Sequence, residues 1–83
     1  MKLQLINGQF SPQAGLDLLT KLTQVKLSHH ERQIATAATE EDVKFREQRI
    51  KALQRDLEAA QRYIAEHGQE GVSLQAEITL IVP

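Results

Sequence analysis

The segment 40–67 constrains the fold of this chain more than any other. Thr39 can cap the start of a helix there, the acidic residues Glu40 to Asp42 suit the positive end of its dipole, and Gly68 supplies a stop. Apolar residues recur at every seventh position, which is typical of a seam between helices: Val43, Ile50, Leu57 and Ile64. Such a helix is about 40 Å long, whereas a compact globule of this chain length is about 30 Å across. The predicted helix therefore overhangs any compact single chain.

A second long helix is predicted over 12–34. Ser11 can cap its first turn, and Pro12 suits the first helical position because it lacks only an amide proton that would have no partner. Its apolar residues cover an arc roughly 200° wide, which is more than one neighbouring helix needs. Residues 35–39 contain no apolar repeat and predict a bend. The two helices should form an antiparallel hairpin.

Alternating segments at both ends of the chain predict strands. Residues 2–6 alternate before the turn residues Asn7 and Gly8, and residues 72–82 alternate over their whole length. The expected fold is therefore α+β in the order β-α-α-β, as one domain covering residues 1–83. In that fold the helical hairpin covers both strands on one face of a short antiparallel sheet.

The small size of the chain favours an oligomer. With 83 residues, folding would bury about 63% of the surface of the unfolded chain, which is marginal for stability. A two-stranded sheet also leaves free edges, and the run from Ile78 to Val82 contains no charge. We expect a homodimer, joined either through the sheet edge or through the helices. The residues expected to carry self-association are Leu74, Ile78, Leu80, Ile81, Leu19, Leu27, Ile50 and Leu57.

Charge and composition exclude several protein classes. Ten basic and eleven acidic residues give a net charge of -1, so no overall field attracts nucleic acid or anionic lipid. The absence of cysteine excludes a disulfide scaffold and thiol chemistry. No apolar run reaches the length of a membrane span, and the first residues do not resemble a signal peptide. We expect a cytoplasmic protein.

One polar cluster interrupts the apolar arc of the first predicted helix. It comprises Lys26, His29, His30 and Gln33, and the hairpin would bring Arg46 beside it. The cluster could bind an anion or another ligand, or form a contact sensitive to pH. It could equally be solvated, or pair with the acidic first turn of the second helix. The sequence from His30 to Ile34 is half of a zinc motif, but Ile34 replaces the second histidine and no metal site is expected.

These observations favour a non-enzymatic, self-associating module that scaffolds or regulates a protein partner. No serine has a base implied beside it, no glycine-rich phosphate loop is present, and no cofactor is expected. A first alternative is a small dimeric regulator that binds nucleic acid through a basic stretch of the second helix. That stretch comprises Lys44, Arg46, Arg49, Lys51 and Arg55. A second alternative is a ligand or anion site at Lys26, His29, His30 and Arg46.

Overall fold

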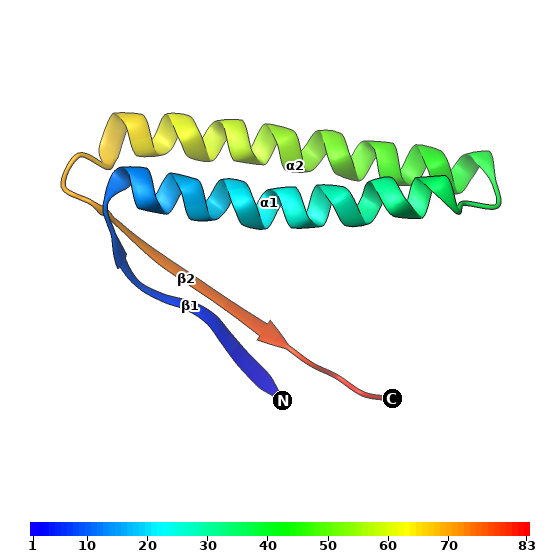
Figure 1. Cartoon of the computed structure of the whole chain (residues 1–83), viewed down its shortest axis with the longest axis horizontal. Helices are drawn as coiled ribbons and strands as arrows, with labels where there is room; N and C mark the ends of the chain where they lie inside the picture. The colour runs from blue at the N-terminus through cyan, green and yellow to red at the C-terminus, as the bar shows by residue number, and fades with distance from the viewer.

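The computed structural model describes residues 1–83 and has the order β1-α1-α2-β2. Strand β1 spans Lys2–Phe10, helix α1 spans Pro12–Ala35, helix α2 spans Glu40–His67 and strand β2 spans Val72–Thr79. The fold is therefore α+β, with a helical hairpin and a two-stranded antiparallel sheet, as the sequence predicted. The helices lie side by side, and the strands leave one end of the hairpin as an arm (Figure 1). The molecule measures 47 × 31 × 13 Å along its principal axes.

The helix ends are held by the predicted caps. The hydroxyl oxygen of Ser11 accepts a hydrogen bond from the amide of Ala14 at 3.1 Å, and that of Thr39 accepts one from Asp42 at 3.1 Å. At the other end of α2 the amide of Gly68 donates to the carbonyl of Ile64 at 2.8 Å. These contacts satisfy main-chain groups that a helix leaves without partners. The hairpin therefore begins and ends where local sequence dictates.

Both strands differ in length from the sequence-based prediction. Asn7 and Gly8 were expected to end the first strand, but β1 continues to Phe10 because β2 lies beside it, with Asn7 opposite Gln75 and Gly8 opposite Leu74. Strand β2 ends at Thr79 instead of reaching residue 82. Beyond Thr79 the main-chain bonds between the two segments continue only from Leu80 to Met1.

A β-bulge at Leu5 changes which side chains of β1 lie on each face of the sheet. Gln4 lies opposite Glu77 and Ile6 lies opposite Ala76, so Leu5 is an extra residue in β1. One face of the sheet consequently collects the apolar side chains of both strands. These are Leu3, Ile6, Phe10, Val72, Leu74, Ala76 and Ile78.

The helices cover only one end of this apolar face, which corrects the expectation that they would cover both strands. The sheet touches α1 near Gly15, where an added Cβ would lie 2.5 Å from Cγ2 of Val72. From that point the strands diverge from the helices (Figure 1). Ile78 is accordingly 42% exposed and Leu80 50% exposed. The buried apolar side chains are few: Ile6, Leu27 and Ile64.

A substitution of Gly71 tests the tight connection between α2 and β2. Gly71 has a φ of 117°, and a Cβ there would lie 3.1 Å from the carbonyl oxygen of Phe10. Gly71→Ala should therefore lower the free energy of unfolding by about 1–3 kcal/mol. Gly8→Ala is the matched control because a Cβ there meets only the Phe10 ring at 3.8 Å. Urea unfolding compares the two variants, and an equal stability would contradict the strain at Gly71.

Candidate functional site

The predicted polar cluster contains one contact between the helices. Nη1 of Arg46 on α2 lies 3.1 Å from Nδ1 of His30 on α1. Because a guanidinium can only donate, Nδ1 is the acceptor and the proton of the neutral imidazole lies on Nε2. His30 is only 3% exposed, and its Nε2 is buried without a hydrogen-bond partner. This contact joins the helices in the half of the hairpin that contains the bend.

Burial lowers the pKa of His30 below its ordinary value of 6.5. The positive charges of Lys26 and Arg46 lower this pKa further. The neighbouring His29 and Arg49 act in the same direction. No ion pair joins His30 to an acidic side chain, so nothing nearby favours the protonated ring. The imidazole is therefore neutral at physiological pH and accepts the hydrogen bond from Arg46.

The other members of the polar cluster do not converge on His30 as a binding pocket would require. Lys26, His29 and Gln33 are exposed, whereas Arg46 is half-buried. The His29 and His30 rings meet edge to face with centroids 5.7 Å apart, and the guanidinium of Arg46 also lies 5.7 Å from the Phe45 ring centroid. The structure thus brings together His30 and Arg46, and leaves the remaining polar groups on the surface.

The basic stretch of α2 is exposed except at Arg46. Lys44, Arg49, Lys51 and Arg55 extend into solvent, while Arg46 is turned toward His30. One of the five basic groups is therefore engaged within the chain. The four others remain as separate surface charges along the helix.

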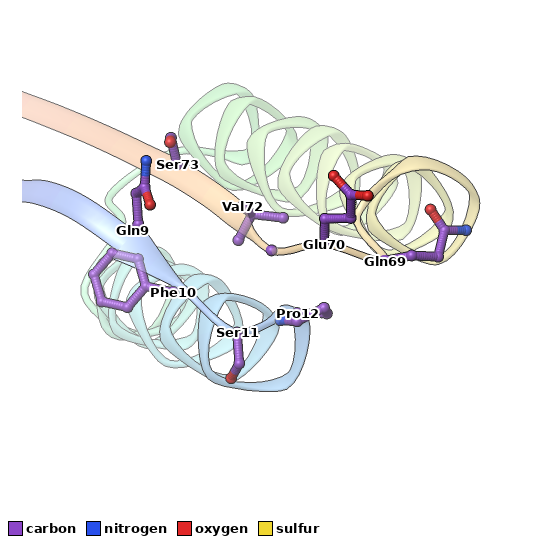
Figure 2. A pocket seen from close by; sticks show the side chains of 9 residues that line it. Gln9, Phe10, Ser11, Pro12, Gln69, Glu70, Val72 and Ser73 are labelled. Atoms are coloured by element: carbon purple, nitrogen blue, oxygen red, sulfur yellow. The ribbon is translucent and has the colours of Figure 1, made fainter.

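A polar hollow lies where the strands meet the helices. Its volume is about 440 Å³, and Figure 2 shows its lining from the end of β1 and from the loop before β2, including Phe10, Ser11, Glu70 and Val72. Ser11 is already engaged as the cap of α1, and Glu70 is the only charged side chain of the lining. The hollow therefore brings no second charged side chain beside Glu70.

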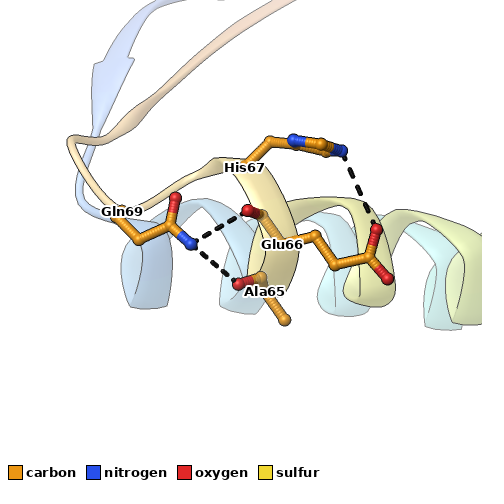
Figure 3. A network of polar contacts seen from close by, with 4 residues as sticks. All are labelled: Ala65, Glu66, His67 and Gln69. Carbon is orange, nitrogen blue, oxygen red and sulfur yellow. Dashed lines mark hydrogen bonds and ion pairs between the residues drawn. The ribbon is translucent and has the colours of Figure 1, made fainter.

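The end of α2 beside this hollow is closed by side-chain bonds. Nε2 of Gln69 donates to the carbonyl oxygens of Ala65 at 3.2 Å and Glu66 at 2.9 Å, and His67 lies 3.8 Å from the Glu66 carboxylate (Figure 3). Carbonyl groups at a helix end otherwise have no partner within the helix. These polar residues therefore stabilise the fold.

An apolar groove occupies the angle between the helices and β2. Its volume is about 390 Å³, and seven of its eight lining residues are hydrophobic. The lining residues are Leu19, Ala59, Ala60, Tyr63, Ile64, Val72, Ser73 and Leu74. We call this feature the wedge groove. It continues toward the exposed part of the sheet face that carries Ile78, because Leu74 and Ile78 lie on the same face of β2.

The residues expected to carry self-association fall into two groups. The strand group lies on β2 or just beyond it and comprises Leu74, Ile78, Leu80 and Ile81. The helix group comprises Leu19, which lines the wedge groove, and Leu27, Ile50 and Leu57. On the helices Leu27 is buried within the chain, while Ile50 and Leu57 are half-buried. The strand group is therefore available to a partner, and Leu27 is not.

Sequence reasoning missed the helical wall of the wedge groove. Ala59, Ala60 and Tyr63 were not among the residues expected to carry self-association, although adjacent small residues let another element approach closely. The groove forms because β2 returns to α1 at Gly15 and then diverges. Its lining depends on that angle.

No set of three or more His, Asp or Glu side chains lies close enough to hold a metal ion. Neither helix combines the length and apolarity needed to cross a bilayer. Comparison with protein families, with curated proteins and with solved structures finds no match. Proposals about function therefore depend on the surfaces described above.

Proposed function

We propose that the protein is a non-enzymatic, self-associating module that works as a homodimer and scaffolds or regulates a protein partner. The observation that carries this proposal is the surface that the chain leaves open. It exposes 6658 Å², whereas a compact protein of 9.4 kDa exposes about 5,000 Å². The excess is about 1,650 Å², and an interface of ordinary size takes about 800 Å² from each partner.

The shape of the chain supports the same proposal. Its radius of gyration is 15.4 Å, compared with about 12 Å for a compact domain of this length. The exposed surface includes large apolar side chains on the diverging sheet and on the residues that follow it: Leu3, Leu5, Ile78, Leu80, Ile81 and Val82. Such side chains are stabilised when a second surface removes them from water.

The helical hairpin supports the part of the proposal that concerns a protein partner. Most side chains along the far half of the hairpin are exposed, including Val25 and Phe45 at 68% and 56%. Phe45 lies near the bend, at the end of the hairpin opposite the point where the strands leave it, so a dimer formed through the strands leaves that end accessible (Figure 1). The helices would then project from the dimer as two docking surfaces.

Light scattering coupled to size exclusion tests self-association. The measurement covers a dilution series in moderate salt, and the expected mass is twice the 9.4 kDa of one chain. A dimer that persists on dilution supports the proposal, because binding of a second copy stabilises the folded chain by mass action. A folded protein that remains at the mass of one chain over the whole series would contradict it.

A further inference from the structure

The hydrogen bonds of the sheet identify which main-chain groups of β2 are free. Met1 and Leu80 exchange two bonds: the amide of Leu80 donates to Met1 at 2.7 Å, and the terminal ammonium donates to Leu80 at 3.0 Å. Bonded and non-bonded pairs alternate in an antiparallel ladder, so the next pair, Lys2 with Thr79, is non-bonded. The amide and carbonyl of Thr79 therefore face the outer edge of β2, and those of Glu77 do the same.

The two outer edges of the sheet are not equivalent. Strand β1 carries the bulge at Leu5, and a bulge interrupts the regular spacing that another strand needs for pairing. The extra residue belongs to β1 alone, so β2 keeps its regular alternation from Val72 to Thr79. Its outward-facing main-chain groups are consequently those of Ser73, Gln75, Glu77 and Thr79. Strand β2 is the edge that can accept a further strand.

We infer that a second copy of this chain pairs with the outer edge of β2, antiparallel and about a two-fold axis at Ala76, to form a continuous four-stranded sheet. This inference rests on the proposed self-association and names its surface. In this register Leu74 lies opposite Ile78 of the partner subunit, and Val72 lies opposite Leu80 of the partner subunit. On the other face Glu77 meets an uncharged group, Gln75 of the partner subunit, so no like charges lie directly opposite.

The diverging arm explains why the occupant is a second copy. Antiparallel pairing brings the exposed end of each β2 beside the start of the other, and the start of β2 is where the helices lie. Ile78 and Leu80 of one copy thereby approach the wedge groove of its partner, while the partner's arm approaches the groove of the first copy. The apolar face also carries no charge, since Lys2 and Glu77 lie on the opposite face, 3.8 Å apart. Another copy supplies an apolar surface with matching strand spacing.

Proline substitutions at two opposed residues test the paired edge. Thr79→Pro removes an amide proton that faces the outer edge of β2, without removing a bond of the β1-β2 ladder. Lys2→Pro is the matched control, because Lys2 lies opposite Thr79 and its amide faces the outer edge of β1. Thr79→Pro should raise the dimer Kd at least about tenfold, since two symmetry-related bonds are lost together. Lys2→Pro should leave the Kd unchanged.

Sedimentation equilibrium gives the Kd of both variants, and circular dichroism verifies that each remains folded. If Thr79→Pro dimerises as tightly as the unsubstituted chain, or Lys2→Pro is the variant that dissociates, the inference is wrong while self-association stands. If the unsubstituted chain is itself a monomer, the proposed function fails as well.

Amide hydrogen exchange in the unsubstituted dimer gives a second measurement that needs no variant. The amides of Glu77 and Thr79 should exchange slowly in the dimer and more quickly at concentrations where it dissociates. Fast exchange of both amides in an intact dimer would overturn the proposed pairing.

Discussion

Replacing Ile64 with alanine is expected to lower the free energy of unfolding by about 2–5 kcal/mol. Ile64 is 8% exposed and lines the wedge groove together with Leu19 and Val72, where α1, α2 and β2 come together. Ile64 is one of the few buried apolar side chains, so its truncation removes a large part of the core and leaves a cavity there. Urea unfolding at fixed protein concentration measures the change.

Val25→Ala serves as the matched control for Ile64→Ala. Val25 is also a β-branched residue within a helix, but its side chain is largely exposed. Its replacement should change the free energy of unfolding by no more than about 0.5 kcal/mol. Equal losses in the two variants would mean that the junction at Ile64 is not the core of the fold.

Acidification should destabilise the protein through His30. The pKa of His30 is lowered in the folded chain, chiefly by burial, so the unfolded chain binds the proton more readily. Stability attributable to this group is therefore complete above pH 6.5, the ordinary pKa, and decreases as the pH falls through the lower folded pKa. Protonation also removes the acceptor for Arg46 and adds a charge near Lys26, His29 and Arg49.

The double variant His30→Leu with Arg46→Met isolates this effect. It removes both partners of the hydrogen bond, so no buried polar group is left without its partner. His29 and His67 remain in the variant, which makes them internal controls. Thermal unfolding near pH 7.5 and pH 5 should show a fall in Tm for the unsubstituted protein and a smaller fall for the variant. Equal falls in the two proteins would refute the role of His30.

The parts of the fold that depend on neighbouring residues could be predicted from the sequence. The start of α1 at Ser11 and Pro12, the Thr39 cap and the stop at Gly68 are local effects, and the heptad seam from Val43 to Ile64 indicates a helix over its whole length. The alternation after Gly71 likewise indicates a strand. These signals require no knowledge of distant contacts.

The remaining features depend on contacts between distant segments. Whether Asn7 and Gly8 turn or continue a strand depends on β2, which is more than 60 residues away in the chain. The bulge at Leu5 likewise depends on how β1 pairs with β2, because a bulge is defined by the register between two strands. His30 and not His29 turns toward Arg46, because the relative rotation of the two helices decides which histidine is buried. The angle of the arm is set where β2 contacts α1 at Gly15.

Pairing of β2 with β2 of a second copy can be observed directly by nuclear magnetic resonance on a mixed dimer, in which one copy is labelled with carbon-13 and the other is not. Filtered Overhauser spectra then report only contacts between copies. We expect contacts that join β2 to β2, including Leu74 of one copy with Ile78 of the partner subunit. A dimer whose contacts between copies involve Val25 and Phe45 on the helices, with none along β2, would contradict it.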